Sequence, residues 1–297
     1  MIVADFLLDM LKKQYGENIS KQIIEGFASK RKVTFRVNTL KTSVDEVEKI
    51  LKREKIEYEK VKWCEEAFIL KEIKETEIEK LDIYKNGNIY LQSLSSMLPP
   101  IILNPKEGAD ILDMAAAPGG KTTQLAAISN NKAHITACEI NNIRAERLKY
   151  NIEKQGASCV YIMQKDARTI DDFFSFDQIL LDSPCSGSGT INTEKEVNIT
   201  KNFIDKISKT QFNLLKKAVK ILKPGSEMVY STCSILYEEN ENNIEKILKE
   251  HNVKIVPIKL QGIEELPILQ AKIEGTLLLA PTELYEGFFV AKLKKMK

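Results

Sequence analysis

Two cysteines follow short apolar runs that are typical of buried strands. Cys185 lies in the turn Ser-Pro-Cys-Ser-Gly-Ser-Gly after Leu180–Asp182, and Cys233 lies in Ser-Thr-Cys-Ser after Val229. Ligands bind at the carboxyl ends of strands in open α/β sheets, so we expect both thiols at one binding edge. This placement indicates covalent chemistry at carbon. Taken alone, Cys233 is interpreted equally well as a buried, inert thiol.

Two thiols suit the methylation of a pyrimidine carbon. A thiolate that adds to C6 of cytosine makes C5 nucleophilic enough to attack a methyl sulfonium, and the adduct must then lose its C5 proton and expel the thiol. Asp182, three residues before Cys185, is placed to stabilise the charge that develops at N3 and the exocyclic amine. Lys121 or a helix N-terminus would lower the pKa of the attacking thiol. We expect the other cysteines, Cys64, Cys138 and Cys159, to serve packing.

A loop of small residues between a strand and a helix predicts a cofactor site. It lets a ligand approach the backbone closely, and the helix start offers free N–H groups. A phosphate-binding P-loop is excluded because alanine stands where its first glycine is required. Glu139, at the end of the next strand, is placed to accept from both ribose hydroxyls, and Asp166, after the third strand, to contact an adenine edge. Nicotinamide cofactors and S-adenosylmethionine both fit. The loop comprises Ala115, Ala116, Ala117, Pro118, Gly119, Gly120 and Lys121.

The elements that must position these residues alternate between strands and helices from about residue 90, which predicts a doubly wound α/β sheet. The helices are expected at Lys121–Ala127, Ile143–Gln155 and Ile204–Leu222. About seven strands, the last two joined by a loop, predict a mostly parallel sheet with an antiparallel hairpin at one edge. The strands are expected at Ile111–Met114, Ile135–Glu139, Val160–Gln164, Gln178–Leu181, Glu227–Ser231, Val253–Ile258 and Phe288–Leu293.

The first 90 residues form a different pattern, a small α+β unit. Helical spacing over residues 1–28 is followed by a strand at Val33–Leu40, a helix opened by Ser43, and extended stretches at Tyr58–Trp63 and Ala67–Leu70. We therefore divide the chain into a small α+β domain, 1–90, and a larger α/β domain, 91–297. The segment Lys30–Lys41 carries five basic residues and no acid. It is interpreted equally well as a strand that follows a phosphate backbone or as a solvated edge strand.

Composition limits the class of protein. The 297 residues are 43% hydrophobic with a net charge of +2, and no apolar run approaches the roughly 20 residues that span a bilayer. Five widely spaced cysteines without a Cys-x-x-Cys pair indicate reduced thiols in a cytoplasm, rather than disulfides or a zinc site. His134 and His251 are isolated. We expect a cytoplasmic monomer that uses neither a membrane nor a metal.

Several motifs together resemble the Sun family of RNA cytosine-C5 methyltransferases, over nearly the whole chain. The segments that carry the resemblance are Arg36–Lys41, Gln92–Pro99, Asp113–Thr123, Asp166–Arg168, Leu181–Thr190, Tyr230–Ser234, Glu238–Glu241 and Gly287–Leu293. The resemblance implies a Rossmann-like methyltransferase fold that uses S-adenosylmethionine. It assigns catalysis to the domain 91–297 and RNA recognition to the domain 1–90. It also implies that Cys233 is the nucleophile and that Cys185 assists product release.

The same resemblance assigns cofactor-binding positions, with Lys121 and Asp182 also near the target base. These positions are Ala115, Ala116, Ala117, Pro118, Gly119, Gly120, Lys121, Glu139, Arg144, Asp166 and Asp182. The function implied is methylation of C5 of cytosine in structured RNA, either tRNA or rRNA. One alternative is a catalytically inactive RNA-binding or assembly factor, although such a protein needs none of the four catalytic groups. Another is a DNA cytosine methyltransferase, in which the Pro-Cys thiol attacks and Cys233 has no explained role.

Overall fold

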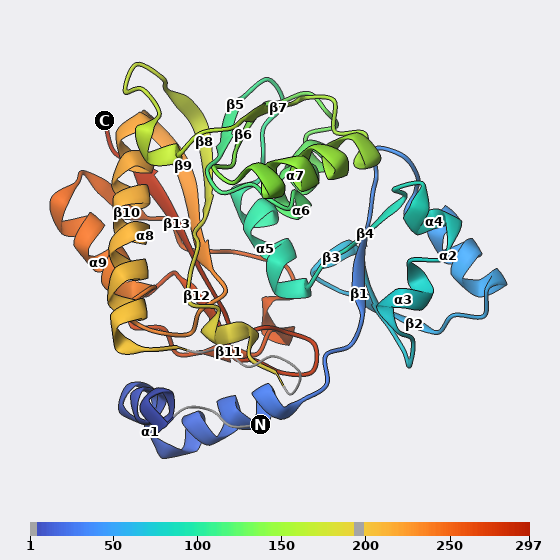
Figure 1. Cartoon of the computed structure of the whole chain (residues 1–297), viewed down its shortest axis with the longest axis horizontal. Helices are drawn as coiled ribbons and strands as arrows, with labels where there is room; N and C mark the ends of the chain where they lie inside the picture. The colour runs from blue at the N-terminus through green and yellow to red at the C-terminus, as the bar shows by residue number, and fades with distance from the viewer. Residues whose placement is uncertain (1–4, 193–198) are drawn as a thin grey trace.

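A mixed sheet, with parallel strands on one side and antiparallel strands on the other, forms the centre of the larger part of the molecule (Figure 1). The computed structural model describes residues 5–192 and 199–297. The strands of this sheet are β5 (Asp110–Asp113), β6 (His134–Cys138), β7 (Val160–Met163), β8 (Phe176–Asp182), β9 (Leu222–Thr232), β10 (Val253–Ile255), β11 (Ile268–Leu269), β12 (Leu277–Leu279) and β13 (Phe288–Lys295). Their order is β11-β12-β13-β9-β8-β5-β6-β7, with β10 paired to β13. Strands β5 to β9 pair in parallel, and β10 to β13 pair antiparallel.

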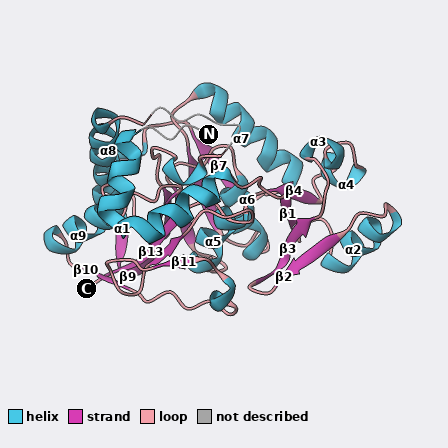
Figure 2. Ribbon diagram, turned by 90° about the horizontal axis from the view of Figure 1, so that it is seen from below, coloured by secondary structure: helices cyan, strands magenta, loops and turns pink. Residues whose placement is uncertain are grey.

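Helices cover both faces of this sheet, which is the arrangement of a Rossmann-like fold. They are α5 (Leu94–Leu103), α6 (Gly120–Ile128), α7 (Asn142–Gln155), α8 (Lys201–Ile221) and α9 (Glu241–Glu250), with short 3₁₀ turns η1 (Ala167–Thr169), η2 (Ser188–Thr190) and η3 (Ile263–Glu265). One face buries apolar residues of α8 and α9, and the other buries those of α5, α6 and α7. Figure 2 shows helices on both sides of the strands. The predicted α/β fold class is confirmed.

The C-terminal edge of the sheet differs from the prediction in detail. All seven predicted strands are present, and β10 and β13 do pair antiparallel. However, β13 lies inside the sheet, between β9 and β12, and the two short strands β11 and β12 were not foreseen. Strands of two or three residues are too short to show an alternating pattern, which explains why the sequence did not reveal them.

The small N-terminal unit is a four-stranded antiparallel sheet of order β2-β3-β1-β4. Its elements are β1 (Thr34–Val37), α2 (Val44–Arg53), β2 (Tyr58–Val61), β3 (Cys64–Leu70), α3 (Glu75–Ile78), α4 (Asp82–Lys85) and β4 (Ile89–Leu91). This β-α-β-β-α-β order is the ferredoxin-like arrangement. Phe35 and Phe68 stack at its centre with ring centroids 5.0 Å apart, and Ser43 caps α2 by accepting from the Glu46 N–H. The small unit predicted for this region is therefore α+β, as expected.

Two basic residues in and after β1 link the small sheet to helices of the larger part. Strand β1 lies between β3 and β4, so it is not an edge strand. Arg36 is buried and donates to the Gln92 side chain at 3.2 Å and to the Thr123 hydroxyl at 3.3 Å. Burial lowers the pKa of Arg36 to about 10. Lys41 donates to the Lys154 carbonyl of α7 at 2.6 Å. The solvated-edge interpretation is wrong, and Arg36 is not available to a phosphate backbone.

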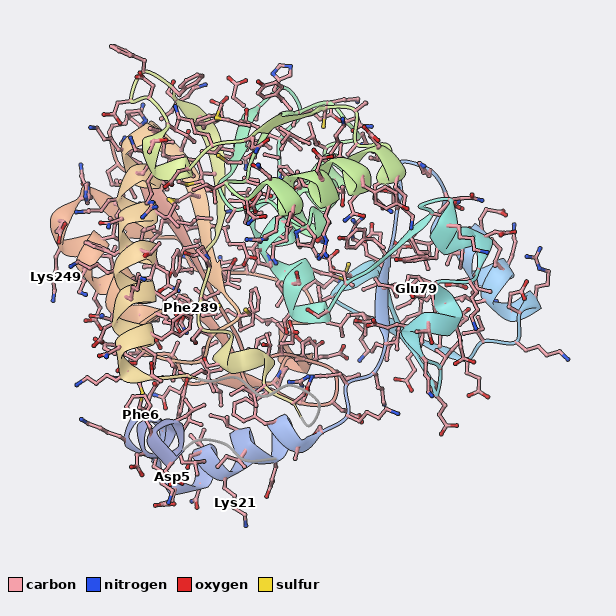
Figure 3. The ribbon with its side chains drawn as sticks, in the orientation of Figure 1. Asp5, Phe6, Lys21, Glu79, Lys249 and Phe289 are labelled. Atoms are coloured by element: carbon pink, nitrogen blue, oxygen red, sulfur yellow. The ribbon has the colours of Figure 1, made fainter. Side chains whose placement is uncertain are left out.

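The first helix, α1 (Asp5–Ala28), packs against the larger sheet and breaks at Gly16 (Figure 1). Leu7, Leu11 and Phe27 are buried in the same apolar cluster as α8. Figure 3 shows Lys21 of this helix pointing away from the molecule and Phe289 of β13 in the interior. The domain boundary near residue 90 remains a prediction. Within the described residues, no helix combines the length and apolar character needed to cross a bilayer.

Replacing Gly26 with alanine is predicted to destabilise the protein. A Cβ at this position would lie 1.9 Å from the Pro281 carbonyl oxygen, so α1 would have to move off the sheet. Overpacking costs about 1–3 kcal/mol, whereas Gly→Ala inside a helix ordinarily stabilises by about 0.5–1 kcal/mol. Urea unfolding of Gly26→Ala, with the exposed Lys21→Ala as control, measures the sign. A more stable Gly26→Ala protein would contradict the close docking of α1.

Candidate active site

The parallel pairing of β8 with β9 brings the two predicted thiols together. Asp182 is opposite Ser231 in the register, so both strands end at the same edge of the sheet. Cys233 follows β9 directly, and Cys185 lies in the turn after β8. The two sulfurs are 3.1 Å apart, within S–H···S hydrogen-bonding contact.

The two thiols have unequal surroundings. The pKa of Cys185 is raised well above its usual value, first by its hydrogen bond with Cys233 and then by burial. Cys185 is therefore a protonated thiol, and its sulfur lies in hydrogen-bonding contact with that of Cys233. The positive charge of Lys121 interacts with Cys233. One sulfur therefore has a cation as a neighbour, and the other belongs to a protonated thiol in contact with it.

Lys121 and Asp182 form a polar cluster at the same edge. The Lys121 ammonium lies 2.7 Å from Asp182 Oδ2 and donates to the Ser96 hydroxyl at 2.7 Å. The Ser231 hydroxyl donates to Asp182 Oδ1 at 2.7 Å. Burial lowers the pKa of Lys121, but the charge and hydrogen bond of Asp182 outweigh this and leave it raised. Lys121 is therefore charged. It contacts one carboxylate oxygen of Asp182, and Ser231 donates to the other.

Two cavities meet at the ends of β8 and β9. The first, of about 360 Å³, extends from the thiols along the carboxyl ends of β5, β6 and β7, and the second, of about 350 Å³, opens toward β4 of the small sheet. Both are lined by Ala115, Ala117, Asp182 and Cys233, so these four residues lie at the junction. A methyl donor in one cavity and an acceptor in the other would meet beside the Cys233 sulfur.

The predicted cofactor residues divide between the two cavities. The first cavity alone is lined by Glu139, Arg144 and Asp166. The second cavity alone is lined by Ala116, Pro118, Gly120 and Lys121. Gly119 is the N-cap of α6 and has a φ of 109°, a conformation that suits glycine. The loop thus forms the wall between the cavities.

The acids of the first cavity are arranged for a nucleoside. Glu139 is buried and accepts from the Asn141 N–H at 2.8 Å, and Arg144 donates to the Ala117 carbonyl at 2.7 Å. Asp166 is held by Arg168 at 2.6 Å, and this hydrogen bond lowers the pKa of the carboxyl. A buried acid at the end of the second strand suits ribose hydroxyls, so the residues present fit S-adenosylmethionine.

Several residues of this site were not assigned roles from the sequence. Ser96 and Ser231 hold Lys121 and Asp182, and Phe288 places its ring 5.7 Å from the Lys121 ammonium. Ser96 and Phe288 come from α5 and β13, far from the cysteines in sequence. The only signal for them was that both lie in segments that carry the family resemblance.

Comparison with known families agrees with this geometry. The family model described as 16S rRNA methyltransferase RsmB/F matches residues 100–294, and a model of the ferredoxin-like domain of RsmF/B-like methyltransferases matches residues 4–77. The chain belongs to the RsmB/F family, which confirms the resemblance to the Sun family.

Individual relatives cover most of the chain. Ribosomal RNA small subunit methyltransferase F of Shewanella piezotolerans is 33% identical over 97% of this chain, and that of Aliivibrio salmonicida is 37% identical over 88%. The chain spans 63% and 57% of the length of these two relatives. A methyltransferase homologue from Pyrococcus horikoshii, a solved structure, is 34% identical with a TM-score of 0.87, covering 99% of this chain and 96% of its own. NSun6 from the same organism, solved with SFG, shares the fold with a TM-score of 0.89 at 24% identity, covering 99% of this chain and 98% of its own.

The free energy of unfolding is expected to depend on pH, because Asp113 is buried at the end of β5. Burial raises the pKa of this carboxyl from 3.8 to about 6, although the Thr122 hydroxyl opposes the shift. A carboxyl whose pKa is raised on folding stabilises the fold below its unfolded pKa and loses that contribution as the pH rises through about 6. The loss is about 3 kcal/mol, because one pKa unit corresponds to about 1.4 kcal/mol.

Unfolding of wild-type and Asp113→Asn proteins in urea between pH 4 and pH 7 measures this loss. The stability of the wild type relative to Asp113→Asn should fall by about 2–2.5 kcal/mol over that range, because part of the full loss occurs below pH 4. The exposed Asp45→Asn serves as control and should show no such trend. A constant difference between wild type and Asp113→Asn would contradict the raised pKa.

Proposed function

We propose that this protein transfers a methyl group from S-adenosylmethionine to C5 of cytosine in RNA, with 16S ribosomal RNA as its substrate. The observation that carries the proposal is the 3.1 Å contact between Cys185 and Cys233 at the junction of two cavities. Membership of the RsmB/F family supports the choice of ribosomal RNA over tRNA. A cytoplasmic location is part of the proposal, because both sulfurs must stay reduced to act.

The nucleophile in this proposal is Cys233. Its sulfur adds to C6 of a cytosine held in the second cavity, and the electron density gained by the ring makes C5 nucleophilic. Lys121, held by Asp182 and Ser96, places a positive charge near the attacking sulfur. Asp182 lies where it stabilises charge at N3 and the exocyclic amine during addition.

The cofactor belongs in the first cavity, where Glu139 and Asp166 would hold the nucleoside and Ala115 and Ala117 line the end nearest the thiols. When bound there, S-adenosylmethionine supplies a methyl sulfonium as the methyl donor. The walls formed by the alanines leave the space beside Cys233 open to both cavities.

Release completes the cycle through Cys185. The methylated adduct loses its C5 proton to water, and the electron pair of the C5–H bond forms the C5=C6 double bond. The bond between C6 and the Cys233 sulfur breaks with its electron pair returning to sulfur. Cys185 is a thiol in hydrogen-bonding contact with that sulfur, so it donates to the leaving thiolate. Without this donor, the adduct would persist.

A transfer assay tests the proposed function. The chain is incubated with radiolabelled S-adenosylmethionine and transcripts of 16S rRNA or tRNA, and bisulfite sequencing locates the product. We expect label in 16S rRNA as 5-methylcytosine. Cofactor binding without any transfer would instead favour the inactive assembly factor, and transfer to tRNA alone would overturn the choice of substrate.

Replacing Cys233 with alanine should abolish turnover, because the variant lacks the sulfur that forms the bond to C6 in this proposal. Affinity for S-adenosylmethionine, measured by calorimetry, should stay within about twofold of wild type, since most of the first cavity is formed by other residues. Cys159→Ala is the matched control, because Cys159 directly precedes β7 and lines neither cavity. Methylation by the Cys233→Ala protein would refute the assigned role.

Replacing Cys185 with alanine should trap a covalent RNA–protein adduct, because the leaving sulfur loses its donor. The adduct would appear as a band of reduced mobility after denaturing electrophoresis, sensitive to ribonuclease. The double variant Cys185→Ala/Cys233→Ala should lack the band. A band in Cys233→Ala but not in Cys185→Ala would show that the roles are reversed.

A further inference from the structure

A buried carboxylate, Glu239, links the loops that carry the two thiols. Its side chain is completely buried, and among the described residues no lysine, arginine or histidine forms an ion pair with it. It follows β9 by seven residues and precedes α9. A charge removed from water without a counter-ion is costly unless hydrogen-bond donors surround it.

The donors that surround Glu239 come from both thiol loops. Its Oε1 accepts from the Ser186 N–H at 2.7 Å and from Gln211 Nε2 of α8 at 3.2 Å. Its Oε2 accepts from the hydroxyls of Ser186 and Ser234, each at 2.5 Å. Ser186 follows Cys185 and Ser234 follows Cys233, so a single carboxylate ties together the residues next to the two sulfurs.

Two further contacts join the same loops without Glu239. The hydroxyls of Ser188 and Ser234 lie 2.8 Å apart, and the Gly189 N–H donates to the Cys233 carbonyl at 3.0 Å. The β8–β9 register fixes the strand ends but not the turns that follow them. Of these links, those of Glu239 are the ones that depend on a charged side chain.

We propose that Glu239 is a positioning residue that holds the Cys185 and Cys233 loops together, so that the two sulfurs meet at the junction of the cavities. The role rests on the proposed function, because a fixed spacing matters only if one thiol acts on the other. Charge-assisted hydrogen bonds are shorter and stronger than neutral ones, which suits a carboxylate to this task.

The charge of Glu239 supports the same division of roles. The pKa of Cys185 is raised by its hydrogen bond with Cys233, by burial, and also by the negative charge of Glu239. The positive charge of Lys121, by contrast, interacts with Cys233. An anion beside one thiol and a cation beside the other make the two sulfurs unequal before any substrate binds.

The sulfur spacing can be measured without any substrate. Phenylarsine oxide condenses with two thiols to give one arsenic atom bonded to both sulfurs, with loss of one water and no change of oxidation state. Tight binding therefore requires two sulfurs that are already close together. The wild-type chain should bind it tightly, and Cys185→Ala should lose roughly a hundredfold or more in affinity because the second bond is no longer intramolecular.

Glu239→Ala removes all four acceptor contacts, and Glu239→Gln keeps an acceptor for the Ser186 N–H but loses the charge. Glu239→Ala should bind phenylarsine oxide at least roughly tenfold more weakly, and Glu239→Gln should be intermediate. Glu250→Gln, on the exposed end of α9, is the matched control. Should Glu239→Ala fail to fold, Ser186→Ala and Ser234→Ala each remove one hydroxyl link and should each weaken binding.

Activity supplies the second readout. Misplacing a reacting group by about 1 Å can cost roughly 100-fold, so kcat of Glu239→Gln should fall well below wild type while KM for S-adenosylmethionine is unchanged. Wild-type affinity for the arsenical, or unchanged kcat, in the Glu239 variants would overturn the positioning role. If the wild-type chain methylates no RNA but its arsenical affinity depends on Glu239, the proposed function fails and the holding of the two loops stands.

Discussion

The parallel pairing of β8 with β9 is the constraint on which the site depends. Because Asp182 and Ser231 are opposite in the register, the two turns that carry Cys185 and Cys233 leave the sheet at the same point. Neither turn alone would place a sulfur against another sulfur. The same register places Asp182 where it accepts from the Ser231 hydroxyl and forms an ion pair with Lys121. The chemistry is therefore assembled by backbone pairing between segments about 50 residues apart.

The fold also explains why two cavities meet at this point. The first follows the carboxyl ends of the parallel strands, which is where doubly wound sheets bind ligands. The second exists because the small antiparallel sheet lies beside α6 and α7, held there by the buried Arg36 and by Lys41. Basic residues that a sequence suggests for RNA contact are used instead to join the two parts. The junction of the cavities is thus a product of both sheets.

Much of this arrangement was predictable from local patterns. Strand–helix alternation indicated the α/β sheet, and the small-residue loop and the two cysteine turns indicated where its ligands bind. The order of the C-terminal strands was not predictable, because β11 and β12 are too short to show periodicity. The packing of α1 on the larger sheet, and the contributions of Ser96 and Phe288, depend on contacts between distant segments that no local pattern encodes. The inward direction of Arg36 was hidden for the same reason.

The central claim is that the Cys233 sulfur bonds to C6 of a cytosine. RNA in which the target cytidine carries fluorine at C5 would test it directly with the wild-type chain, because fluorine cannot leave as the proton does and the adduct is retained. Mass spectrometry of the digested complex then identifies the modified residue. The account predicts a nucleotide on Cys233 in the presence of S-adenosylmethionine. A nucleotide on Cys185, or methyl transfer with no adduct on either cysteine, would contradict it.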